Sequence, residues 1–261
     1  MTESRATALR CIDCGAVYAL DYRLECATCR GLLELSYDWE ALRRAGPRVF
    51  EGGGLWRYAP VLPIADPAHR VTLGEGQSPL LPCPALGRQL GVRRLLVKFE
   101  GSNPTGTVKD RSSPTAVAAA LQFGFRATSV VSSGNAGSSI AAYSARAGLR
   151  SLIFAYERTS APKLLHMAAT ATDLVLYQGV YDDLIGLWDR LVEDRLFFDC
   201  GPPATPTSTR ARRPSPTRSP SSRPGGYRTW SSRPSRWARP SSPPTADSPS
   251  SSGSAGSRGG L

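Results

Sequence analysis

The chain has 261 residues, of which 41% are apolar, so it can bury the core of one large or two small domains. Its formal net charge of +11 suggests a nucleic-acid-binding protein until the charge is located along the chain. Residues 201–261 contain ten Arg, no Lys and one acidic residue, which gives +9 and leaves +2 for residues 1–200. The basicity therefore belongs to the C-terminal tail, and residues 1–200 have the composition of an ordinary globular protein.

The N-terminus gives no sign of export or membrane insertion. The first ten residues lack the apolar stretch of a signal peptide, and no apolar run has the length of a membrane span. Six cysteines without a secretion signal indicate free thiols or metal ligands rather than disulfides. We therefore expect a cytoplasmic protein with no membrane partner.

Two pairs of cysteines near the N-terminus have the pattern of a zinc ribbon. Cys11 and Cys14 form one CxxC pair, and Cys26 and Cys29 form a second pair after eleven further residues. Each pair can present two thiolates to one tetrahedral ion, and the segment between them is long enough for a β-hairpin that brings the pairs together. Because all four ligands are cysteine, a bound zinc is structural. The alternative is four reduced thiols in a module that has lost its metal.

From residue 95 onward, short apolar runs alternate with helical periodicity. The predicted strands are residues 95–99, 129–132, 152–155 and 174–177, and the predicted helices are residues 115–122, 138–147, 161–169 and 181–195. Alternating βα units with short links require a parallel sheet covered by helices on both faces. The fold class is therefore α/β, and ligands in such sheets collect beyond the carboxyl ends of the strands.

Two loops occupy strand-to-helix positions in this pattern. The first, EGSNPTGTVKDR at residues 100–111, carries Lys109 on a backbone path set by Gly and Pro. The second, SSGNAG at residues 132–137, contains Asn135 and follows the next predicted strand. A lysine between charged neighbours is, taken alone, typical of a surface charge cluster. The two loops together suggest a lysine-bound cofactor at the edge of the sheet.

These loops and the segment TLGEGQSPLL at residues 72–81 resemble the pyridoxal-phosphate enzymes of the tryptophan-synthase β-like fold, and within them the threonine synthases. The resemblance covers roughly residues 10–200. It implies an incomplete fold type II domain, preceded by the zinc-ribbon-like segment, that converts O-phosphohomoserine to threonine and phosphate on pyridoxal 5'-phosphate. The alternative activities within this fold are those of cysteate synthase and threonine dehydratase.

The resemblance also assigns roles to residues of both loops. It implies that the amine of Lys109 bonds to the cofactor's aldehyde and later moves protons on the substrate, and that Asn135 hydrogen-bonds the cofactor's ring oxygen. Backbone N–H groups and hydroxyls at the start of the next helix are expected to hold the carboxylate of a small amino-acid substrate. The predicted substrate-binding residues are Ser132, Ser133, Gly134, Asn135 and Ala136. The family further implies a homodimer.

Residues 201–261 depart from this pattern. Of these 61 residues, 16 are Ser, 12 are Pro and 10 are Arg, a composition that predicts disorder. The resemblance places the remaining strands and the loop for the cofactor phosphate in this part of the chain, so impaired activity is expected. A segment typical of the family, written in GC-rich codons and read one base later, gives the sequence of residues 210–220. Our hypothesis is a shift of reading frame near residue 201, through a mutation or a sequencing error.

We therefore divide the chain into three parts: a zinc-ribbon-like segment (1–40), the N-terminal part of a pyridoxal-phosphate dependent catalytic domain (41–200) and a disordered tail (201–261). Two non-enzymatic alternatives remain, a nucleic-acid-binding protein that uses the tail and a zinc-ribbon interaction module beside an inactive enzyme domain. The tail has no RS or RGG repeat, and its aromatic residues Tyr227, Trp230 and Trp237 are few for base stacking, so nucleic acid is not the expected partner.

Overall fold

The computed structural model describes residues 3–170, 173–179, 183–185, 188, 191 and 196–201. Residues 202–261 of the predicted tail, and most of the predicted helix at residues 181–195, lie outside the described residues. The disorder of the tail and the domain boundaries at residues 40 and 200 therefore stay predictions. Within the described part of the chain, no helix combines the length and the apolar character that crossing a membrane requires.

A small antiparallel sheet organises the N-terminal segment. Its strands are β1 (Ala6–Cys11), β2 (Val17–Tyr18) and β3 (Leu33–Tyr37), in the spatial order β2-β1-β3. The hairpin joins β1 to β2 because Gly15, with a φ of 76°, closes a tight turn directly after Cys14. The prediction of a hairpin lying wholly between the two cysteine pairs is therefore wrong.

Short helical segments lead from this sheet to the main domain. They are α1 (Trp39–Ala45) and 3₁₀ turns at Pro47–Val49, Leu55–Val61 and Pro67–His69. Asp38 caps α1 by accepting a hydrogen bond from the backbone N–H of Ala41 at 2.8 Å. The indole of Trp56 donates to the carbonyl of Val71 at 2.8 Å and so fixes the end of this stretch.

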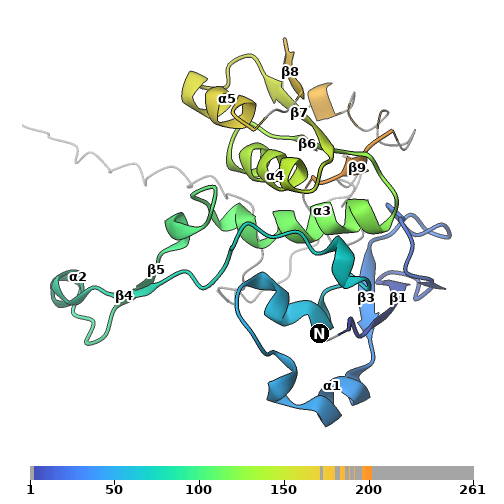
Figure 1. The fold of residues 1–261 in the computed structure, drawn as a ribbon, viewed down its shortest axis with the longest axis horizontal. Helices are drawn as coiled ribbons and strands as arrows, with labels where there is room; N and C mark the ends of the chain where they lie inside the picture. The colour runs from blue at the N-terminus through green and yellow to red at the C-terminus, as the bar shows by residue number, and fades with distance from the viewer. Residues whose placement is uncertain are drawn as a thin grey trace, which may run out of the picture. The chain divides into compact units, whose positions relative to one another are not determined.

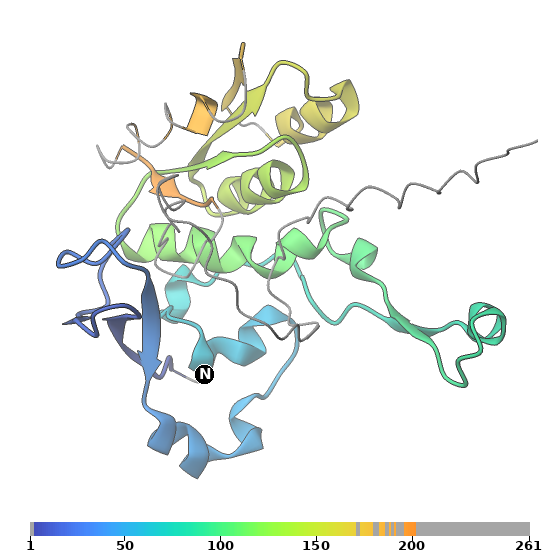
Figure 2. The ribbon, with the colours of Figure 1, turned by 180° about the vertical axis from the view of Figure 1, so that it is seen from behind.

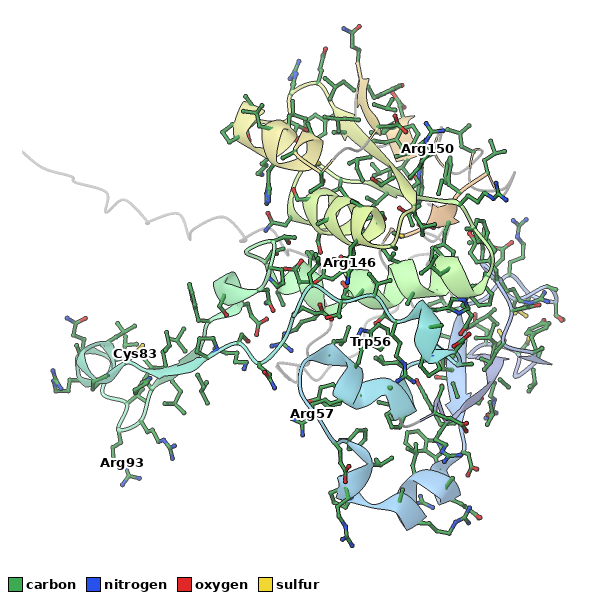
Figure 3. The ribbon with its side chains drawn as sticks, viewed as in Figure 1. Trp56, Arg57, Cys83, Arg93, Arg146 and Arg150 are labelled. Carbon is green, nitrogen blue, oxygen red and sulfur yellow. The ribbon has the colours of Figure 1, made fainter. Side chains whose placement is uncertain are left out.

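The strand predicted at residues 95–99 is present but lies outside the parallel sheet. β4 (Leu80–Pro82) and β5 (Leu96–Lys98) form a separate antiparallel pair, with α2 (Pro84–Gln89) between them. Figure 1 shows this pair extending away from the main sheet, and Figure 3 marks it by Cys83 and Arg93. The assignment to the parallel sheet is wrong, because the backbone groups of β5 hydrogen-bond to β4 in an antiparallel pair.

The main sheet, within the described residues, has four parallel strands in the order β8-β7-β6-β9. They are β6 (Ala127–Val131), β7 (Arg150–Tyr156), β8 (Asp173–Tyr177) and β9 (Phe198–Asp199). The helices are α3 (Ser113–Gln122), α4 (Asn135–Arg146) and α5 (Ala161–Ala168). α4 connects β6 to β7 and α5 connects β7 to β8, which confirms the predicted βα alternation (Figure 1).

Side chains of the main sheet alternate between two cores. Val130 and Ile153 face a core formed with α3, α4 and α5, whereas Val131 and Phe154 face a second core that contains Trp188. In Figures 1 and 2, α3 and α4 run side by side next to the sheet. Both faces of the sheet are therefore covered, as predicted.

Tyr22, which lies between the two cysteine pairs in sequence, joins the N-terminal segment to the main core. Its ring is 7% exposed and meets the edge of Phe125, with ring centroids 4.8 Å apart. It also packs against Phe198 of β9 at 5.2 Å. The cysteine-bearing segment therefore contributes a side chain to the core of the main domain.

Candidate functional site

Lys109 lies on a 3₁₀ turn, Val108–Arg111, directly before α3. The hydroxyl of Thr107 accepts a hydrogen bond from the backbone N–H of Lys109 at 3.3 Å. The hydroxyls of Ser112 and Ser113 donate to the carbonyl oxygen of Lys109, each at 3.1 Å. The backbone of Lys109 is thus held from both sides, while its amino group forms no hydrogen bond or ion pair with another described residue.

The carboxylate of Asp110 holds the lysine loop from within the protein. It is fully buried and accepts hydrogen bonds from the backbone N–H of Thr105 at 2.7 Å and from the Thr105 hydroxyl at 2.5 Å. It also accepts from the hydroxyl of Ser139 on α4 at 2.6 Å. Because Ser139 lies one helical turn after Asn135, on the same face of α4, this bond ties the lysine loop to the part of α4 where Asn135 lies.

A second network ties the lysine loop to residues 72–81. Arg111 and Glu100 form a bidentate ion pair, with Nε–Oε2 at 2.6 Å and Nη2–Oε1 at 2.8 Å. The hydroxyl of Ser78 donates to Glu100 at 2.8 Å and accepts from Arg111 at 2.9 Å. The Arg111 guanidinium, with the hydrogen bonds from Ser78 and Asn103, lowers the pKa of Glu100 to about 2. Residues 72–81 and residues 100–111 are therefore in direct contact.

Glu75 connects residues 72–81 to α4 as well. Its side chain is 1% exposed, and its Oε2 accepts hydrogen bonds at 3.0 Å from the Thr72 hydroxyl, the Leu73 N–H and the Tyr143 hydroxyl. Its Oε1 is buried without a hydrogen-bond partner among the described residues. Burial and the Glu75 charge raise the pKa of Tyr143, so this hydroxyl remains a donor.

The second loop leaves the carboxyl end of β6 and enters α4, as predicted. The hydroxyl of Ser132 accepts hydrogen bonds from the backbone N–H groups of Gly134 at 3.2 Å and Gly137 at 3.0 Å, so it caps the helix. The other side chains of this loop are at least partly exposed: Ser133, Asn135 and Ala136. The structure thus brings the five predicted substrate-binding residues together, but the Ser132 hydroxyl is already bound by the protein itself.

The donors at this site suit a cofactor with an aldehyde. Lys109 supplies an amine without a partner among the described residues, and Asn135 supplies an exposed amide. In the first turn of α4, the N–H groups of Asn135 and Ala136 have no acceptor among the described residues and can bind an anion. These residues fit pyridoxal phosphate. The sequence motifs located Lys109 and Asn135 but missed the support given by Asp110 and Ser139. The only sequence signal for this support is that Asp110 is an acidic residue beside the lysine.

The four cysteines converge, as the sequence predicts. Their sulfur atoms all lie within 4.8 Å of one another, with Cys11–Cys29 at 3.5 Å and Cys14–Cys26 at 3.6 Å. A tetrahedral zinc with Zn–S bonds of about 2.3 Å separates its sulfurs by about 3.8 Å, so the cluster fits this ion. The hydroxyl of Tyr18, 3.1 Å from the sulfur, lowers the pKa of Cys26 to about 5, whereas the neighbouring thiols Cys14 and Cys11 raise the pKa of Cys29 to about 12. A thiolate is the form that binds metal.

Comparisons with known proteins identify the family of this chain. Residues 71–213 match a family model described as pyridoxal-phosphate dependent enzyme. A threonine synthase of Methanocaldococcus jannaschii is 35% identical over 72% of this chain and 48% of its own length, and one of Methanosarcina acetivorans is 32% identical over 69% and 44%. The crystal structure of apo diaminopropionate ammonia lyase from Escherichia coli matches 50% of this chain and 41% of that chain, with 16% identity and a TM-score of 0.45. The chain spans about half the length of the curated relatives it matches.

Proposed function

The chain belongs to the family of pyridoxal-phosphate dependent enzymes, and from this premise we propose that it is threonine synthase-like, with O-phosphohomoserine as its substrate and threonine and phosphate as its products. The observation that carries the proposal is the bond from Ser139 to Asp110, which joins the lysine loop to the helix that begins with Asn135. The two archaeal threonine synthases support this choice of substrate. Cysteate synthase and threonine dehydratase activities are the alternatives that share the same chemistry.

In this proposal Lys109 holds the cofactor and moves protons. When bound, pyridoxal phosphate supplies the electron sink for negative charge that develops on the substrate. The amine of Lys109 holds the cofactor's aldehyde and, once released by substrate, takes up and returns protons at the substrate's α and β carbons. Thr107, Ser112 and Ser113 hold the backbone of Lys109 by hydrogen bonds, so only its side chain has to move when the amine is released.

In this proposal the loop at residues 132–136 binds the substrate and orients the cofactor. The N–H groups of Asn135 and Ala136 bind the substrate carboxylate, because no described residue accepts a hydrogen bond from them and they lie at the positive end of the helix dipole. Asn135 donates its amide to the ring oxygen of the cofactor. Ser132 acts differently from its predicted role: its hydroxyl holds the backbone of the loop in shape, so it positions the substrate site.

The remaining parts of the proposal follow from the cysteines and the family. The four-cysteine cluster holds a structural zinc, since all four positions of a tetrahedral ion are filled by sulfur and none is left for water. As the family implies, the protein is a homodimer of the cytoplasm. The free thiols of the described cysteines suit a reducing compartment.

Turnover by this chain is proposed to be weak. The composition of residues 201–261 leaves no counterpart of the family's loop for the cofactor phosphate. A shift of reading frame near residue 201 accounts for this composition. Sequencing the gene tests the hypothesis: a neighbouring frame that encodes a Gly-rich loop supports it, and the lack of such a frame contradicts it.

Two measurements test the proposed function. In equilibrium dialysis against pyridoxal phosphate, the wild-type chain and an Arg146→Ala control should each bind one cofactor per chain, and Lys109→Ala should lose this binding. Equal binding by Lys109→Ala contradicts the role of Lys109. Phosphate release from O-phosphohomoserine should occur well below roughly 1 s⁻¹, the lower end of ordinary enzyme rates. An ordinary rate contradicts the proposed impairment.

A further inference from the structure

Lysine is rare in this chain. Lys98, Lys109 and Lys163 are its only lysines, and the other 29 of its 32 basic residues are arginines. Lys98 donates to the carbonyl oxygen of Ser78, next to the Glu100–Arg111 ion pair, so two of the three lysines belong to the site described above. A lysine offers a compact ammonium, whereas an arginine offers a planar guanidinium.

Lys163 lies in the first turn of α5, and its side chain runs along the loop that precedes α4. A Cβ atom at Gly134 would lie 3.4 Å from Cδ, 3.6 Å from Cε and 3.7 Å from Nζ of Lys163. One turn further, a Cβ atom at Gly137 would lie 2.5 Å from the sulfur of Met167. Because Lys163 and Met167 share one face of α5, the close packing of α5 on α4 aims Lys163 at the loop.

The charge of Lys163 has no protein counter-ion at this place. Within the described residues no carboxylate forms an ion pair with its ammonium, and the residue is exposed to solvent. The start of α4 carries a partial positive charge of its own. Two positive charges side by side repel unless an anion lies between them. An oxyanion at residues 132–136 would contact both.

We propose that Lys163 is a further substrate-binding residue, whose ammonium binds an oxyanion of the amino-acid substrate at residues 132–136. The inference rests on the proposed function and adds to it a cation from α5, an element that the sequence motifs do not include. The oxyanion is the α-carboxylate or the phosphate ester of the substrate. An ammonium can bind either group in the same way, and the choice of ligand in the experiment distinguishes the two.

Calorimetric titration of the pyridoxal-phosphate-loaded chain with O-phospho-L-homoserine and with L-homoserine tests the proposal. Lys163→Met should weaken binding of O-phospho-L-homoserine by about tenfold, as the loss of one charge-assisted hydrogen bond predicts. The matched control is Arg146→Met, which removes the same charge from the far end of α4, roughly 17 Å away, where Figure 3 labels it. The control should bind within twofold of wild type.

The two ligands identify the oxyanion. Equal weakening of both ligands by Lys163→Met assigns the ammonium to the carboxylate, whereas weakening of the phosphorylated ligand alone assigns it to the phosphate. Binding of both within twofold of wild type overturns the proposal. Should Lys163→Met fold poorly, Lys163→Gln gives the same comparison with a polar side chain.

Failure of this inference is distinct from failure of the proposed function. Lys163→Met should keep the cofactor binding that Lys109→Ala loses. If wild type binds the cofactor and Lys163→Met binds substrate normally, only the role of Lys163 is lost. If wild type binds no cofactor, the proposed function is contradicted, and the inference falls with it.

Discussion

The cysteine cluster and the lysine loop are held in place in opposite ways. The four cysteine sulfurs come from one short segment, in which Cys11 and Cys29 are 18 positions apart. The lysine loop depends on distant partners, since Asp110 bonds Ser139 29 positions away and Arg111 bonds Ser78 33 positions away. The first site is closed by its own segment, and the second needs the main domain to be assembled around it.

This difference decides which chemical changes each site should tolerate. A metal ion can organise the cysteine segment directly, because all its ligands are local. The lysine loop is organised by the carboxylates of Asp110, which is buried, and Glu100, which is partly buried. Each accepts several hydrogen bonds, so removing either carboxylate should destabilise the loop. The experiments that follow probe this contrast, from the largest expected effect to the smallest.

Loss of zinc should have the largest effect. Structural zinc contributes about 10 kcal/mol in small cysteine modules, so Cys26→Ser should reduce bound zinc from about one per chain to almost none and should lower the melting temperature markedly. Elemental analysis and thermal unfolding measure both. Cys83→Ser is the control, because Cys83 lies outside the cluster. Zinc content that is equal in the two variants would contradict the metal centre.

Replacement of Asp110 should come next. Asp110→Ala leaves the N–H and hydroxyl of Thr105 and the hydroxyl of Ser139 without their acceptor, and should cost about 3 kcal/mol in the free energy of unfolding. Ser139→Ala removes one of these bonds and should cost about 1 kcal/mol. Urea unfolding measures both variants. A cost for Asp110→Ala no larger than that for Ser139→Ala would mean that the carboxylate does not organise the loop.

Replacement of Arg111 should have a smaller, pH-dependent effect. Because the pKa of Glu100 is lowered from 4.5 to about 2, the ion pair stabilises the fold fully above about pH 4.5, and this stabilisation is lost as the pH falls through about 2. Arg111→Met should cost about 1 kcal/mol at pH 7, and its difference from wild type should shrink as the pH falls from about 4.5 through about 2, because the wild type then loses the same ion pair. Urea unfolding between pH 2 and pH 7 tests this. Superimposable acid profiles would contradict the assigned pKa.

Tyr143→Phe should have an effect no larger than that of Arg111→Met at pH 7. The substitution keeps the ring and removes one of three hydrogen bonds to Oε2 of Glu75, so it should cost about 1 kcal/mol. Thermal unfolding measures it, and Tyr58→Phe, an exposed tyrosine, is the control. A larger loss than that of Asp110→Ala would place the organising carboxylate at Glu75 instead.

The fold was predictable where the sequence pattern is local. Short apolar runs and helical periodicity located β6, β7, β8 and the helices between them to within a few residues. The same pattern could not place β5, because residues 95–99 look alike whether they pair with β4 or with β6. The structure pairs this strand with β4, and periodicity marks a strand without recording its partner.

The cysteine cluster and the lysine loop also differ in how much of each could be predicted from local sequence. The four cysteines of the cluster could be found from spacing alone. Lys109 and Asn135 could be found from their motifs, but the support of Lys109 could not, because Asp110 and Ser139 meet only after the chain has folded. Lys163 belongs to no recognisable motif either. Its position beside Gly134 is seen only in the folded structure.

The central claim is that Lys109 is the residue that holds the cofactor. Borohydride reduction of the chain in the presence of pyridoxal phosphate, followed by peptide mass spectrometry, tests it most directly because the chain has only three lysines to distinguish. We predict that the pyridoxyl group is found on Lys109, with Lys98 and Lys163 unmodified at one equivalent of cofactor. A label spread evenly over the three lysines, or absent from Lys109, would contradict the account.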